Sequence, residues 1–448
     1  MTAPVRRASV FAIISTFALA VPFGGPWAGA ALAAVVILGA LAVTDGPIFD
    51  LLAYPSDYED GRLYGLITFV LAAVALGLIA VTTSMTLAVF AGTVLLVGYG
   101  NAAAQLVRQR TDSDVAIVTA FCLVATVAAI VGQAVTVALT DGTGTLEAIS
   151  STGPVMVFLG GSGALLAALL RDVLYSNDDP IVMLSVGLLC WLLVELEPTQ
   201  TMPGIVAALA VTIALGYVSY ALETASIAGM LTGILLGLLT IVLGGYGWFV
   251  VLISFFAIGG LSSKFRYEQK ETMGVAEDNN GARGSGNVLG NAAVAIVAVL
   301  GYAASSAALM PGDPDPGLFL FAFAGSVATA MSDTLSSEIG SVFESPRLIT
   351  TLEPVEPGTD GGVTWQGEVA GLAGAAVVAS ISYVLFPEVT TVGAGIIVAA
   401  GVVGMTVDSL LGATLEGTVL GNQGVNFLAT LSGALICALL GLSFAVLG

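Results

Sequence analysis

The feature that most constrains this chain is a series of apolar segments, each about 17–24 residues long, that recurs from Ser9 to the C-terminus. A helix of that length crosses the roughly 30 Å hydrocarbon layer of a bilayer. Residues 63–81 and 226–243 are apolar on every face, unlike the alternating strands of a membrane barrel. Only 9% of the residues are charged, which excludes an ordinary soluble chain. We therefore expect an all-α, polytopic helical membrane protein.

Hydropathy windows predict about fifteen membrane helices. They fall near residues 8–24, 26–43, 63–82, 84–106, 115–139, 153–170, 181–196, 203–222, 225–243, 246–262, 286–309, 317–334, 367–386, 392–411 and 425–446. If the N-terminus with Arg6 and Arg7 is cytoplasmic, every other base also falls in a cytoplasmic loop, as positively charged loops usually do. The sequence thus predicts a multi-pass protein of the cell membrane with its polar chemistry on the cytoplasmic side.

Several residue types narrow the possible chemistry. The chain has no histidine, which removes the commonest general base and transition-metal ligand. Its three cysteines, Cys122, Cys190 and Cys437, are scattered inside apolar runs and are expected to be small core residues. The net charge of −20 would repel nucleic acid, so no nucleic-acid partner is expected. This acidity, with lysine nearly absent, indicates a high-salt cytosol such as that of a halophilic archaeon.

The two halves of the chain differ in their polar content. Residues 1–200 carry no concentrated polar motif and are expected to be a scaffold or a degenerate copy of a lipid-kinase-like region. Residues 98–110, GYGNAAAQLVRQR, faintly echo residues 404–417, GMTVDSLLGATLEG, so an internal repeat is one interpretation. Residues 201–448 are expected to form the catalytic membrane domain, because their polar residues gather in four blocks at helix ends.

The first block, residues 264–291, contains the stretch GARGSGN directly before an apolar helix. Backbone amides of Gly284 and Gly286 and the positive end of the helix would face an anion there. Lys270 and Arg283 would add positive charge, and Asn287 lies beside them. The stretch lacks the Gly-Lys-Ser/Thr ending of a Walker loop, so a flexible connector and a phosphate site both remain open.

The second block, residues 325–342, brings oxygen ligands to the end of a helix. Asp333 and Ser337 are four residues apart and share a face, with Glu338 slightly to one side. Carboxylate and hydroxyl oxygens suit Mg²⁺, and carboxylates at membrane depth are costly unless they serve a function. The alternative is a solvated helix end in an acidic protein.

The third block, residues 344–368, is a polar loop with one base, Arg347, and a turn that includes Gly358 and Gly361. Turn formation explains the glycines, whereas Arg347 requires a partner such as a phosphate or a carboxylate.

The fourth block comprises residues 404–417 and 421–427. Asp408, Gly412 and Glu416 recur every four residues along one face, with Ser409 beside the first. Asn422 and Asn426 follow in the next helix. Asp408 is the sole charge in the apolar run of residues 389–415, and such a carboxylate usually binds a cation or a proton.

Together these blocks resemble the integral membrane family that contains transmembrane protein 19 and plant phytyl-phosphate kinase, over about residues 205–448. The strongest parts are GARGSGNVLGN, DTxSSE, PRLITTLEPVxPGTDGGVT and VDSLLGATLEG followed by NxxVNF. Leu335 departs from the tryptophan that relatives often carry after the Asp-Thr pair, which changes packing but leaves the oxygen ligands intact.

The resemblance implies phosphoryl transfer from a nucleoside triphosphate, with CTP the expected donor, to phytyl or geranylgeranyl phosphate held in the bilayer. It assigns Mg²⁺ to Asp333, Glu338 and Asp408, assisted by Ser337 and Ser409. It assigns the phosphates to Lys270, Arg283 and Arg347, with the amides of Gly284, Gly286, Gly358 and Gly361, while Asn287, Asn422 and Asn426 would bind donor or acceptor. Such a transfer needs positioning and charge neutralisation rather than a covalent nucleophile.

Two other functions fit the same residues. A cytidylyltransferase that makes a CDP-activated lipid would use the same triphosphate, metal and lipid phosphate but attack a different phosphorus. An ion-coupled transporter would bind a cation at Asp408 near mid-membrane. The concentration of charge at one membrane face disfavours the transporter.

Overall fold

The computed structural model describes residues 3–140, 146–174, 179–273, 283–343 and 345–444. Across these ranges the chain is almost entirely helical, and thirteen helices are long and apolar enough to cross a membrane. The structure therefore confirms a polytopic all-α membrane protein.

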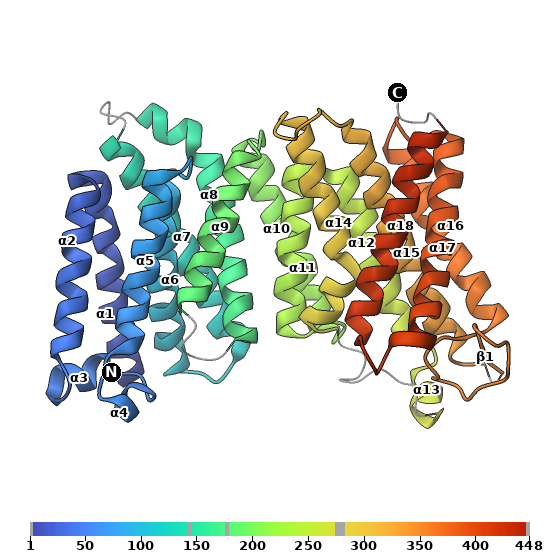
Figure 1. Ribbon diagram of the computed structural model, residues 1–448, viewed down its shortest axis with the longest axis horizontal. Helices are drawn as coiled ribbons and strands as arrows, with labels where there is room; N and C mark the ends of the chain where they lie inside the picture. Colours follow the sequence, from blue (N-terminus) through green and yellow to red (C-terminus); the bar gives the residue numbers. More distant parts are fainter. Residues whose placement is uncertain (1–2, 141–145, 175–178, 274–282, 344, 445–448) are drawn as a thin grey trace. The chain divides into compact units, whose positions relative to one another are not determined.

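Two features separate this number from the fifteen helices expected from the sequence. Residues 4–42 form one helical stretch, but Gly25 interrupts it with a φ of 78°, a backbone conformation that glycine adopts readily, and Pro26 follows. The chain reverses direction there, as shown by the next helix, α3, which contacts α1 again (Figure 1). The second feature is α9, which has 17 residues and is shorter than each of the thirteen. Both expected helices at residues 8–43 and the one at 181–196 are thus present.

The chain divides into two compact units, Met1–Leu209 and Ala210–Gly448, here called unit 1 and unit 2. The helices that begin in unit 1 are α1 (Ala3–Ser15), α2 (Ala20–Ala42), α3 (Gly46–Leu52), α4 (Asp57–Asp60), α5 (Tyr64–Thr82), α6 (Leu87–Arg108), α7 (Asp114–Thr140), α8 (Leu146–Val173), α9 (Asp179–Glu195) and α10 (Met202–Ala221). A single 3₁₀ turn, Thr16–Leu19, joins α1 to α2.

Helix α6 lies at the centre of unit 1, where it contacts α1, α7, α8 and α9. Its crossing with α7 is close because both helices place glycine there: a methyl group on Gly132 would lie 3.2 Å from the Cα atom of Gly92. Small residues at such crossings let helices approach closely within a membrane.

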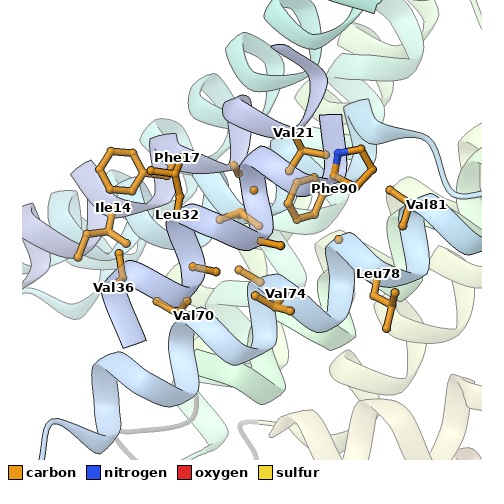
Figure 2. Close-up of a pocket in the computed structure, with 18 of the residues that line it drawn as sticks. Ile14, Phe17, Val21, Leu32, Val36, Val70, Val74, Leu78, Val81 and Phe90 are labelled. Carbon is orange, nitrogen blue, oxygen red and sulfur yellow. The ribbon is translucent and has the colours of Figure 1, made fainter. Parts of the chain in front are cut away.

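Unit 1 also contains an apolar pocket of about 320 Å³ between α1, α2, α5 and α6. Figure 2 shows some of its lining side chains, among them Ile14 of α1, Phe17 of the 3₁₀ turn, Val70 of α5 and Phe90 of α6. Its apolar walls and its position among membrane-spanning helices suit a hydrocarbon chain.

Unit 2 is organised around α15. The elements are α11 (Ile227–Leu239), the π-helical turn Thr240–Gly244, α12 (Tyr246–Ser263), α13 (Tyr267–Met273), α14 (Ser285–Ser306), α15 (Pro316–Gly340), β1 (Arg347–Leu348), β2 (Gly362–Val363), α16 (Trp365–Leu385), α17 (Thr391–Leu415) and α18 (Asn422–Ser443). Helix α15 contacts α12, α14, α16, α17 and α18, and its residues Phe321, Phe323 and Met331 are fully buried.

The short strands β1 and β2 pair antiparallel, with Arg347 opposite Val363 and Leu348 opposite Gly362. Both strands belong to the segment that joins α15 to α16, and their pairing makes that segment a loop. The hydroxyl of Thr364 then accepts a hydrogen bond from the backbone N–H of Gly367, which caps the start of α16. The segments around α13 and β1 lie at the same end of unit 2 in Figure 1.

The crossing of α15 with α18 provides a test of this packing. A methyl group on Gly433 would collide with Thr329 and lie 3.0 Å from the carbonyl oxygen of Gly325. We expect Gly433→Ala to lower the free energy of unfolding by about 1–3 kcal/mol, because overpacking forces neighbours apart. The measurement is thermal unfolding in detergent micelles. Gly395→Ala is the matched control, since a methyl group there meets no atom within 4 Å; equal effects from both changes would contradict the packing described.

Candidate functional site

A polar cavity of about 470 Å³ lies in unit 2, where α14, α15, α17 and α18 meet the segment between α15 and α16. Its lining includes eleven of the residues singled out by the sequence: Arg283, Asn287, Asp333, Ser337, Glu338, Gly358, Gly361, Asp408, Ser409, Asn422 and Asn426. Residues far apart in the chain are therefore brought to one place. We call this cavity the acidic chamber.

Asp333 and Asp408 lie next to each other in the lining of the acidic chamber. Each lies about two turns before the end of its helix, α15 or α17. Their carboxyl groups are within hydrogen-bonding range of each other. The Oδ2 atom of Asp408 is buried and has no hydrogen-bond partner among the described residues. Two neighbouring carboxyl groups, one of them with a buried oxygen that accepts no hydrogen bond, provide oxygen donors that suit a hard divalent cation.

The segment between α15 and α16 is held against α17 by glycine. Gly361 has a φ of 73°, and a methyl group on Gly412 of α17 would lie 3.1 Å from the backbone nitrogen of Gly361. Glycine is thus needed on both sides of this contact. The close approach places Asp360 in the lining, near the end of α17.

Glu416, just beyond α17, also lines the acidic chamber. Burial, followed by the charge of Asp360, raises the pKa of Glu416, while a hydrogen bond from Asn422 acts in the opposite direction. Asn422 in turn accepts a hydrogen bond from Asn426 over 3.3 Å. This network joins the end of α17 to the start of α18.

Arg283 is the one cation among the described residues that line the acidic chamber, against five carboxylic acids. Its backbone is fixed by hydrogen bonds with the turn before α11, to the carbonyl of Thr224 and from the N–H of Ser226. Its guanidinium lies over the ring of Phe255 at 5.5 Å and beside Gly259 of α12. A side chain at position 259 would displace it, so the glycine makes room for the charge.

Lys270 and Glu338 form a buried ion pair with each other. The ammonium of Lys270 also lies 3.4 Å from the carbonyl oxygen of Ser262, at the end of α12. Lys270 was expected to bind phosphate and Glu338 to bind metal, but in this structure they neutralise one another and fix α13 against α15. Among the described residues, no three acids stand together as a metal-ligand group. The metal role of Glu338 and the phosphate role of Lys270 stay predictions, while the ion pair shows that each already has a partner.

Arg347, Gly284 and Gly286 lie outside the described lining of the acidic chamber. The guanidinium of Arg347 donates to the carbonyl oxygen of Leu352 at 2.7 Å, within its own loop. Gly284 precedes the first residue of α14, and Gly286 packs against Gln423 of α18. The role of these three residues in phosphate binding stays a prediction. Residues 274–282 of the first block fall outside the described residues.

The hydroxyl groups expected to assist a metal have local partners. Ser337 donates to the carbonyl oxygen of Thr334 at 3.1 Å, and Ser409 donates to that of Met405 at 3.3 Å. Both retain oxygen lone pairs that can accept a further bond.

Several residues that line the acidic chamber were not predicted from the sequence. Asn291 donates to the carbonyl oxygen of Asn287 one turn before it, and Ser336 and Thr359 also line the acidic chamber. The four-residue spacing of Asp408, Gly412 and Glu416 already placed Glu416 on the lining face, although it was not assigned to the site. Asn291 repeats the same spacing after Asn287.

The buried ion pair gives a second test. Lys270→Met or Glu338→Gln leaves a partner without its counter-charge, and we expect each change to lower the free energy of unfolding by about 3–5 kcal/mol. The double variant should lose less than the sum, because no unpaired charge remains. Denaturant titration in micelles measures this cycle, with Glu271→Gln, an exposed acid on α13, as the control. Strictly additive losses would show that the two residues do not interact.

The part of the chain that holds the acidic chamber is similar to known membrane proteins. The family model described as Integral membrane protein DUF92 matches residues 210–434. An uncharacterized membrane protein of Methanocaldococcus jannaschii is 35% identical over 218 residues, which cover 47% of this chain and 84% of that protein. The chloroplastic protein VTE6 of Arabidopsis thaliana is 32% identical over 220 residues, 48% of this chain and 65% of that protein. No solved structure matches the chain.

Proposed function

Because the chain belongs to the integral membrane protein family DUF92, we propose that unit 2 is a prenyl-phosphate kinase. It would transfer a phosphoryl group from a nucleoside triphosphate, with CTP as the donor, to phytyl or geranylgeranyl phosphate. The family resemblance to plant phytyl-phosphate kinase supports this substrate class. The observation that carries the proposal is the acidic chamber itself, which gathers the acids, Arg283 and the asparagines of all four sequence blocks.

The charge of the acidic chamber favours a metal-dependent reaction of phosphates. Even with Glu338 neutralised by Lys270, four acids against one guanidinium would repel a triphosphate unless cations entered with it. Asp333 and Asp408 would hold Mg²⁺, and the ion would neutralise charge on the phosphates. Membrane phosphoryl transfer thus explains why so many carboxyl groups occupy one cavity.

The chain's own residues would position the two substrates. In the reaction, an oxygen of the acceptor monophosphate forms a bond to the γ-phosphorus while the bond from that phosphorus to the bridging oxygen breaks, and the nucleoside diphosphate leaves. The acceptor is already an anion at neutral pH, so no strong base is needed. Arg283 would hold a phosphate through paired N–H groups, and Asn287, Asn422 and Asn426 would donate hydrogen bonds to the donor or acceptor.

The direct test is incubation of the purified full chain with Mg²⁺, labelled CTP and geranylgeranyl or phytyl phosphate in micelles. We expect prenyl diphosphate and CDP in equal amounts, and no product when the divalent cation is chelated. Release of pyrophosphate with a CDP-linked lipid would instead indicate nucleotidyl transfer. Absence of lipid diphosphate with every nucleoside triphosphate would contradict the proposal.

The neighbouring carboxyl groups allow a matched set of variants. Asp333→Asn and Asp408→Asn should each reduce kcat by about 100-fold or more, because each removes a charge that would stabilise the transferring phosphoryl group. Glu388→Gln, an exposed acid between α16 and α17, should leave kcat unchanged. Steady-state rates on folded protein, verified by size-exclusion chromatography, provide the measurement. Near-normal rates for both aspartate variants would remove them from the site.

A further inference from the structure

Unit 1 contains a second polar cavity that the proposed kinase reaction does not use. It has a volume of about 530 Å³ and lies among α1, α6, α7, α8 and α9. Three of the six arginines in residues 1–209 line it: Arg7 from α1, Arg108 from α6 and Arg171 from α8. In a chain with a net charge of −20 and eleven bases, such a gathering requires an explanation. We call this cavity the arginine cavity.

Arg171 is held in place from several sides. It forms an ion pair with Asp179, and its guanidinium lies 5.5 Å from the centre of the Phe121 ring. The hydroxyl of Tyr54 donates to the other carboxylate oxygen of Asp179 over 3.2 Å. Burial and the charge of Asp179 raise the pKa of Tyr54, so this hydroxyl stays a donor. The arrangement fixes the guanidinium before any ligand arrives, which lowers the entropic cost of binding.

Arg7 is positioned in a similar way. One of its terminal nitrogens donates to the carbonyl oxygen of Ala53 at 2.7 Å, and its guanidinium stacks 3.9 Å from the centre of the Tyr54 ring. Tyr54 thus lies beside Arg7 and is linked through Asp179 to Arg171. A guanidinium that makes one hydrogen bond and one stacking contact keeps further N–H donors for a ligand.

Helix α6 completes the lining. Asn101, Gln105 and Arg108 are spaced by four and three residues, so they share one face of the helix, and all three line the arginine cavity. Arg108 is exposed, whereas Asn101 and Gln105 are partly buried. The segment GYGNAAAQLVRQR, which the proposed reaction left without a role, therefore supplies a row of hydrogen-bond donors.

The remaining charges favour an anionic ligand. Asp172 and Asp179 are the acids among the described lining residues, and Asp179 is already engaged by Arg171 and Tyr54. Planar guanidinium groups bind phosphate oxygens in pairs, and neutral amides add donors without opposing charge. The acidic chamber of unit 2 has the opposite balance, so a phosphate there would need accompanying cations, whereas the arginine cavity itself supplies the positive charge.

Apolar residues indicate what carries the anion. Ile117, Val118, Phe121 and Val182 line the arginine cavity beside its charged groups. Phe11 packs edge-on against both Tyr54 and Phe69, with ring centres 5.8 and 5.2 Å apart. Phe69 lines the apolar pocket and Tyr54 lines the arginine cavity, so Phe11 contacts a lining residue of each. This amphipathic surrounding suits a phosphate attached to a lipid chain.

We propose that the arginine cavity is a second ligand site, which binds a phosphate-class anion through Arg7, Arg108 and Arg171. The site is independent of the kinase reaction proposed for unit 2. The phosphate would come from a lipid headgroup or from a soluble phosphate, and both present the same oxygen atoms to the guanidinium groups.

The test uses the full chain carrying Arg283→Gln, which weakens phosphate binding in the acidic chamber. Native mass spectrometry counts retained phosphatidic acid, with diacylglycerol as the probe that lacks phosphate and inorganic phosphate as a soluble competitor. We expect phosphatidic acid to be retained and diacylglycerol to be lost. Arg108→Gln should weaken retention by about tenfold or more, because charged hydrogen bonds to phosphate are lost. Arg110→Gln, also exposed and two residues along the chain, is the matched control and should bind like its parent.

Each outcome bears on the site directly. Retention of phosphatidic acid that inorganic phosphate does not displace assigns a lipid headgroup, whereas displacement at millimolar phosphate assigns a soluble anion. Because Arg108 is exposed, the Arg108→Gln variant is expected to fold. The Arg7→Gln variant tests phosphatidic acid retention independently, from another helix. The proposal is overturned if Arg108→Gln and Arg7→Gln both bind like the parent, if Arg110→Gln loses as much as Arg108→Gln, or if neither phosphate probe binds.

Discussion

The imbalance of charge in the acidic chamber is the constraint on which the rest of unit 2 depends. Carboxylates near membrane depth are costly, and each must be paired, hydrogen-bonded or bound to a cation. Glu338 is neutralised by Lys270, and Glu416 is hydrogen-bonded by Asn422. Among the described residues, Asp333 has Asp408 and the nearby charge of Arg283, whereas the partner of Asp408 is Asp333 alone. The acids that remain uncompensated are therefore those that a divalent cation would satisfy.

Close helix packing makes this arrangement possible. Glycine at positions 325 and 433 lets α15 and α18 approach, and the contact of Gly361 with α17 brings a polar segment over the ends of the helices. Between α15 and α17 the close contacts are at Gly401 and Gly404, where a methyl group would meet Ala328 at 3.0 Å or collide with Thr329. Larger residues at these two points would separate the helices that carry Asp333 and Asp408. Helix packing and the position of the acids thus depend on small residues, because the two carboxyl groups can lie close together only if their helices do.

Much of this could be read from the sequence. The apolar runs predicted each long helix and the break near Gly25, because length and hydropathy decide which segments can cross a membrane. Some ends differ: α8 begins at Leu146 rather than 153, and α15 ends at Gly340 rather than 334. Asp333 and Asp408 were expected in one metal site once the family resemblance was considered, and both line the acidic chamber. The pairing of Lys270 with Glu338 could not be predicted, because it depends on how the short helix α13 docks. The arginine cavity was missed because Arg7, Arg108 and Arg171 lie far apart in the chain and no local motif joins them.

Binding of a divalent cation by the neighbouring aspartates tests the central claim most directly. Mn²⁺ can stand in for Mg²⁺, and its electron paramagnetic resonance signal changes when the ion is bound by protein oxygens. We expect the purified full chain to bind Mn²⁺, Mg²⁺ to displace it, and the Asp333→Asn/Asp408→Asn double variant to lose that binding while remaining folded. Equal Mn²⁺ binding by the chain and the double variant would contradict the account.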